Sequence, residues 1–199
     1  MPVANVQWNA VAFGNGRFVA VSSGGTPSGP AAYSVDGVNW TMSNGTLGNR
    51  YSIAYGNGRF VAVGNLTNAA YSIDGTTWNT ITTPTTTNGN AFTFGAGKFV
   101  NIVGSTALST ADGITWSPSS LPANLGWGAL VYGGGIFLAT ANTNTTTLIS
   151  SDGGNNWTTG GLPPIAGSYW TNIAYGNGRF VAVQLTTGSA GSRNVIYTN

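Results

Sequence analysis

Three residue types that carry strong chemistry are missing from this sequence: it contains no cysteine, no histidine and no glutamate. Without cysteine there is no disulfide and no thiolate nucleophile. Without cysteine or histidine the usual transition-metal sites are not expected, so we predict no metal and no cofactor. Acid–base chemistry by carboxylates is therefore limited to four aspartates.

Charge of either sign is also scarce, because only 5% of the 199 residues are charged, six of them basic and four acidic. The basic residues form no stripe, so we expect no nucleic-acid partner. Residues 1–13 contain neither a basic stretch nor a long apolar run, so we expect neither a signal peptide nor membrane insertion. The protein would then leave a cell only by lysis or as part of a particle.

One unit, residues 51–78, is repeated along the rest of the chain and reads YSIAYGNGRFVAVGNLTNAAYSIDGTTW. Its β-branched and aromatic runs predict three strands, A to C, with glycine-rich turns between them. The Asp74-Gly75 turn then leads into a fourth strand, D, which carries Trp78. We therefore predict a four-stranded antiparallel meander of about 40 residues.

The A–B turn has five copies, at residues 13–18, 55–60, 94–99, 132–137 and 175–180. The C–D turn has four, at residues 34–40, 72–78, 110–116 and 150–157. This period and strand count predict an all-β fold, a five-bladed β-propeller with one blade per repeat. The single domain would divide into blades at about 8–46, 47–85, 86–122, 123–165, and 166–199 plus 1–7.

The C–D turns resemble the Asp-box of the BNR-repeat and sialidase superfamily, with the glycine here directly after the aspartate. The matching residues are Asp36, Trp40, Asp74, Trp78, Asp112, Trp116, Asp152 and Trp157. The resemblance implies a structural turn, in which the aspartate binds backbone groups and the tryptophan packs between blades. It indicates a fold more than an activity.

The two chain ends are expected to meet in the last blade. Residues 194–199 match strand C, and the sequence stops where a fifth box would begin. Residues 2–6 are the candidate for the missing strand D. Such a closure would remove two exposed sheet edges, so we predict a monomeric ring closed by the N-terminal strand.

The two ends of each blade differ in how strongly they repeat. In a meander the A–B and C–D turns share one end, which is nearly constant here. The B–C loops and D–A connections lie at the other end, and the B–C loops vary in length and sequence: residues 22–30, 65–68, 104–106, 141–146 and 186–193. Variable loops on a repeated scaffold are where binding function is usually carried.

A basic residue follows four of the five A–B turns: Arg17, Arg59, Lys98 and Arg179, with Ile136 in the fourth repeat. We expect these residues to form charge pairs with the box aspartates and so to pin the two turns. Two registers are open. Pairing within a repeat leaves Asp152 and Arg179 without partners, and pairing with the preceding box leaves Asp112 and Arg17 without partners.

Three tryptophans, Trp8, Trp127 and Trp170, begin strand A beneath the variable end, where Arg50 and Gly89 replace them in the second and third repeats. They are either ordinary inter-blade packing or, with Arg50, sugar-stacking platforms. Because glycine is accepted at this position, we take the tryptophans and Arg50 as the candidate ligand-binding residues.

Sialidase-like hydrolysis requires a glutamate beside the nucleophile, which this sequence lacks, and all four aspartates stand in boxes. We therefore predict a non-catalytic recognition or structural module. The repeat resembles those of predicted bacteriophage tail and bacterial surface proteins, which implies a virion or extracellular location. The expected partners are a glycan, a cell-surface receptor or other virion proteins, and a free lectin is the alternative.

Overall fold

The computed structural model describes residues 6–24, 29–45, 47–87, 89–161, 168–186 and 195–198. All regular structure in these ranges is β-strand, and none of it is a helix that could cross a membrane. The strands form five separate sheets.

The strands of the first three sheets are as follows. Sheet 1 holds β1 (Gln7–Gly14), β2 (Arg17–Ser23), β3 (Ala31–Ser34) and β4 (Thr41–Met42). Sheet 2 holds β5 (Ser52–Gly56), β6 (Arg59–Val63), β7 (Asn68–Ser72) and β8 (Asn79–Thr82). Sheet 3 holds β9 (Phe92–Gly95), β10 (Lys98–Val103), β11 (Thr106–Thr110) and β12 (Ser117–Ser120).

Sheet 4 holds β13 (Trp127–Gly133), β14 (Ile136–Ala141), β15 (Thr146–Ser150) and β16 (Thr158–Gly161). Sheet 5 holds β17 (Ser168–Gly176), β18 (Arg179–Thr186) and β19 (Val195–Thr198). Every neighbouring pair of strands is antiparallel and consecutive in sequence, which confirms the predicted meander. The strand D predicted at residues 2–6 cannot be assessed, because residues 1–5 lie outside the described part of the chain and Val6 is in no strand.

The A–B turns adopt the backbone conformation that their sequences predict. Asn57 and Gly58 both have positive φ, 47° and 77°, as a two-residue hairpin turn requires. Asn15 and Asn177 repeat the same conformation at 49° and 50°. In the third copy this turn position is Ala96, whose φ is 48°, a left-handed conformation that costs alanine free energy.

The core consists of four apolar clusters, each between two consecutive sheets. Between sheets 1 and 2, Val19 and Val21 of β2 pack against Ile53 and Phe60. Equivalent clusters join sheets 2 and 3, sheets 3 and 4, and sheets 4 and 5. We call the face that packs on the preceding sheet the front face, and the opposite one the back face.

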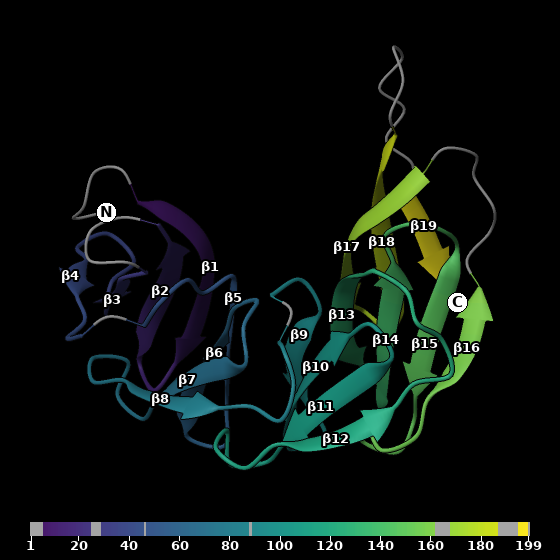
Figure 1. The fold of residues 1–199 in the computed structure, drawn as a ribbon. Helices are drawn as coiled ribbons and strands as arrows, with labels where there is room; N and C mark the ends of the chain where they lie inside the picture. The colour runs from purple at the N-terminus through teal and green to yellow at the C-terminus, as the bar shows by residue number, and fades with distance from the viewer. Residues whose placement is uncertain are drawn as a thin grey trace.

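The sheets follow one another in a curved row, with sheet 1 at one end and sheet 5 at the other (Figure 1). The first strands of consecutive sheets pack together, so β1, β5, β9, β13 and β17 lie side by side along the row. The outer faces of sheets 1 and 5 keep exposed apolar side chains. In the described part of the chain these two faces do not cover each other, and the predicted closed ring is not found there.

Candidate functional site

The four C–D turns, called aspartate turns from here on, are built around their carboxylates. Asp74 Oδ1 accepts hydrogen bonds from the backbone N–H groups of Thr76 and Thr77, at 2.8 and 2.9 Å. The Ser72 hydroxyl donates to the same oxygen at 3.0 Å and itself accepts from Gly75 N–H at 2.8 Å. The other three aspartates bind their own turns in the same way. Each aspartate therefore bonds backbone groups of its own turn, which is the geometry that a structural role requires.

These hydrogen bonds hold the carboxylates in their charged form. Backbone hydrogen bonds from Thr115 and from Asn156 lower the pKa of Asp112 and of Asp152, each to about 2. Burial raises the pKa of Asp74, but the hydrogen bonds from Thr76 and Thr77 outweigh it and place the pKa below its usual range. A carboxylate so strongly ionised is a poor proton donor near neutral pH.

The tryptophans of the aspartate turns pack between sheets wherever a preceding sheet exists. Trp78, Trp116 and Trp157 each contribute to the cluster at their own sheet's front face. Trp40, on sheet 1, has no such neighbour and is partly exposed.

The predicted arginine–aspartate charge pairs are not formed by the described residues, and neither register proposed from the sequence is correct. Arg17 and Arg59 lie over the rings of Tyr33 and Tyr71, 5.3 and 5.7 Å from the ring centres. Lys98 donates to Asn155 Oδ1 of the following sheet at 2.8 Å. The aspartates accept hydrogen bonds from neutral N–H and O–H groups of their own turns instead. The basic residues and the aspartates lie at the same end of each sheet without pairing with each other.

Two of the three candidate tryptophans are not available for stacking. Trp127 and Trp170 are 1% and 0% exposed. Trp127 donates from Nε1 to Gly104 O at 2.8 Å, and Trp170 packs in the cluster between sheets 4 and 5. Their role as exposed sugar platforms is therefore corrected to packing between sheets. Trp8 differs, because it is partly exposed and lines a hollow with Asn9 and Val11.

Glycine is accepted at this position for a reason the sequence does not show. A Cβ added to Gly89 would overlap the side chain of Tyr51, which belongs to the preceding sheet. Tyr51 therefore occupies the space that a larger residue would take. Glycine is therefore compatible with a packing position, because the side chain that fills the space comes from the neighbouring sheet.

Arg50 is the fourth candidate, and the structure places it deep between sheets 1 and 2 at the variable end. It is 1% exposed, and burial lowers its pKa to about 10. Its Nη1 donates to Asn49 O at 3.1 Å and to Asn68 Oδ1 at 3.0 Å. Its Nε and Nη2 are buried without a hydrogen-bond partner among the described residues.

The backbone of Arg50 is fixed by the preceding sheet. Its N–H donates to Ser22 O at 2.8 Å, and its carbonyl accepts from Asn9 Nδ2 at 2.8 Å. The guanidinium is thus held by amide oxygens, and no carboxylate of the described part of the chain bonds to it. Two unpaired donors on a buried cation are costly, which makes this the least satisfied polar position of the described loop end.

Sequence reasoning missed a set of apolar side chains at the constant end. Val35, Val38 and Ile73 are 69%, 78% and 63% exposed. They occupy variable positions of the aspartate turns, and their apolar character within otherwise polar turns was the available signal.

Comparisons with known proteins identify the fold. No family model and no curated protein matches this sequence. Solved structures do match: the structure described as YCF48 bound to D1 peptide has a TM-score of 0.67 at 14% identity, covering 98% of this chain and 68% of that one. YCF48 from Cyanidioschyzon merolae has a TM-score of 0.68 at 11% identity, covering 100% and 73%.

A third neighbour is the glutaminyl cyclase of Myxococcus xanthus, with a TM-score of 0.56 at 14% identity, covering 98% of this chain and 93% of that one. All three neighbours are β-propellers, and each sheet of this chain corresponds to a propeller blade. At these identities the similarity establishes the fold alone.

Proposed function

We propose that this chain is a non-catalytic propeller module that binds a peptide or protein surface through the variable loop end, with Arg50 as its polar anchor. The observation that carries the proposal is the buried guanidinium at that end, whose Nε and Nη2 donors have no partner among the described residues. A carboxylate or a peptide carbonyl offers the acceptor oxygens that these two donors lack. Because both atoms lie below the surface, a ligand would reach them only after the flanking side chains shift.

Two further observations support a binding role over catalysis. The sequence contains no glutamate, and its four aspartates are engaged in turn hydrogen bonds. One similar propeller is described as bound to a peptide, which fits a partner of this class.

The proposal is tested with the purified chain on a peptide array whose members end in either a free carboxylate or an amide. We expect binding to peptides with a free carboxylate, weakened about tenfold or more in Arg50→Gln. Arg59→Gln is the matched control, because it removes the same charge at the constant end, and it should bind as the wild type does. Thermal unfolding checks that both variants are folded. Binding that survives Arg50→Gln but is lost in Arg59→Gln would place the binding site at the constant end and would contradict the proposal.

A neutral glycan is the second candidate ligand, because Trp8 remains partly exposed beside Asn9 in one hollow. A glycan array with wild type and Trp8→Ala tests it. Binding that Trp8→Ala removes and Arg50→Gln leaves intact would favour the glycan.

The proposed setting is a virion or the outside of a cell, where this scaffold would serve attachment. Its motive is the nearly uncharged composition rich in small polar residues. Mass spectrometry of purified particles tests this location, and absence of the chain from them would favour a free lectin.

A further inference from the structure

The curved row of five blades, called the arc from here on, has two outer faces: the front face of the first blade and the back face of the last. At the four interfaces within the chain, a back face and a front face of these same kinds pack against each other. One apolar position on the front face recurs in the first strand of every blade. In blades two to five it holds Ile53, Phe92, Leu130 and Ile173, which are 7–8% exposed. The same position in the first blade is Val11, and it is 58% exposed. Phe13 on the same face is also 58% exposed. Val11 and Phe13 differ in exposure from their equivalents in the later blades because no described blade precedes the first one.

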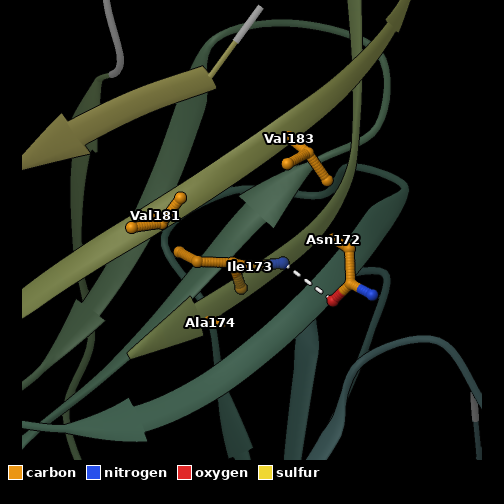
Figure 2. Close-up of a pocket in the computed structure, with 5 residues that line it drawn as sticks. All are labelled: Asn172, Ile173, Ala174, Val181 and Val183. Carbon is orange, nitrogen blue, oxygen red and sulfur yellow. Dashed lines mark hydrogen bonds between the residues drawn. The ribbon is translucent and has the colours of Figure 1, made fainter. Parts of the chain in front are cut away.

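The back face shows the reciprocal pattern in the last blade. Val21, Val63 and Ile102 are fully buried by the following blade, and the equivalent Val183 is 39% exposed. Val183 and Val181 share a face with Asn172 and Ala174 of the neighbouring strand. These four side chains border an open hollow, in which Asn172 Oδ1 accepts from Ile173 N–H at 2.8 Å (Figure 2).

Glycine at the end of strand A gives a second, independent sign. A Cβ at Gly14, Gly56, Gly95 or Gly133 would overlap an aromatic ring of the next blade. A Cβ at Gly176 would meet nothing within 4 Å. The glycine of the last blade therefore leaves room for an aromatic ring that no described residue supplies.

Neither outer face has the character of a cap. Terminal repeats of stacked proteins usually carry polar outer faces, which keep them soluble. Here the outer faces keep the apolar residues of the internal interfaces, including Val11, Phe13 and Val183. They are built to be covered.

The lengths of the similar structures give the size of the gap. The chain superposes better on 68% or 73% of the longer YCF48 chains, at TM-scores of 0.67 and 0.68, than on 93% of the glutaminyl cyclase, at 0.56. Five blades that match about 70% of a YCF48 chain correspond to about seven blades over the whole of such a chain. A second copy of this chain has five blades, whereas the gap has room for about two, so a second copy does not fit in the ring.

We propose that the arc is completed by two further blades of this same repeat, which cover its two end faces. One blade covers Val181 and Val183 with its front face and places an aromatic ring against Gly176. The other covers Val11 and Phe13 with its back face. The two further blades are thus four-stranded sheets with valine-rich back faces and aromatic front faces.

The test uses the absence of cysteine, since a single introduced thiol is then a unique probe. The full chain is prepared with Val11→Cys or with Val183→Cys, and Ile53→Cys and Val63→Cys are the buried controls at equivalent positions. In the chain alone we expect the first two thiols to react about tenfold or more faster than the controls. Slow labelling of Val11→Cys in the chain alone would overturn the proposal, and sedimentation would then separate self-association from closure of a five-bladed ring.

The gap is measured by extending the chain with its own repeats as the probe. Residues 74–122 or 74–165, joined after residue 199, supply the fifth blade's remaining strand together with one or two additional blades. We expect either extension to protect Val183→Cys, and only the longer one to protect Val11→Cys. Protection of Val11→Cys by the one-blade extension, or its continued fast labelling when the two-blade extension has protected Val183→Cys, would also overturn the proposal.

Discussion

Replacing Ala96 by asparagine should stabilise the protein, because the third A–B turn departs from its own repeat at this position. Asn15, Asn57 and Asn177 occupy the same turn position, with φ between 47° and 50°. Ala96 has φ of 48°, a conformation that costs alanine about 1–2 kcal/mol and costs asparagine less. The substitution therefore relieves local strain without changing the fold.

The structure also indicates a gain between blades. Asn57 Nδ2 donates to Gly97 O and Ala111 O of the following blade, at 2.8 and 2.9 Å. In the next interface, Ala96 has no side-chain donor for the equivalent carbonyls of Gly135 and Ser151. Each exposed hydrogen bond of this kind adds about 0.5 kcal/mol, so we expect Ala96→Asn to raise the free energy of unfolding by about 1.5 kcal/mol in all.

The assay is urea and thermal unfolding followed by tryptophan fluorescence, with an expected rise in Tm of about 3–6 °C. Ala96→Gly separates the two contributions, because it removes the strain but adds no donor, and it should give a smaller gain. Asn57→Ala is the reverse control and should destabilise by a similar amount. A neutral or destabilising Ala96→Asn, together with a harmless Asn57→Ala, would refute the reasoning.

Three further predictions concern the aspartate turns and the blade contacts. Asp74→Ala should lower the free energy of unfolding by about 1 kcal/mol in urea titrations while the folded fraction binds unchanged. The pKa values of Asp112 and Asp152 fall from 3.8 to about 2 on folding, so their contribution to the free energy of unfolding is complete above about pH 4 and is lost towards pH 2. Unfolding measured across this pH range should show the loss. Salt should have little effect on it, because the hydrogen-bond partners of both aspartates are neutral. Gly133→Ala should destabilise by about 1–3 kcal/mol, and Gly176→Ala should be neutral in the isolated chain.

The blades could be predicted from the sequence because their signals are local. The Asn57-Gly58 pair favours a two-residue hairpin between the strands that flank it, and the Asp74-Gly75 turn satisfies its own backbone donors. Neither feature depends on what surrounds the blade. The order of strands therefore followed from residues a few positions apart, and the resemblance of the aspartate turns to a known box implied their structural role.

The candidate site could not be predicted in the same way, because it depends on which side chains meet across blades. Trp170 and Arg50 stand at equivalent positions and both are buried, but among the described residues Arg50 leaves two donors without a partner, Nε and Nη2, and Trp170 leaves only Nε1. Gly89 is allowed there because Tyr51 reaches over from the preceding blade. A repeat pattern compares each position with its copies, and it carries no information about these cross-blade contacts.

The same limit applies to the number of blades in the ring. Val11 and Ile53 occupy equivalent apolar positions, and the sequence cannot tell that one is 58% exposed and the other 8%. Repeat count equals blade count only when the angle between successive blades lets the last one reach the first. That angle is set where two blades meet, at contacts such as Gly133 against Tyr175, which join residues of different repeats. Five repeats therefore predict five blades, whereas closure depends on contacts between blades that the repeat pattern does not contain.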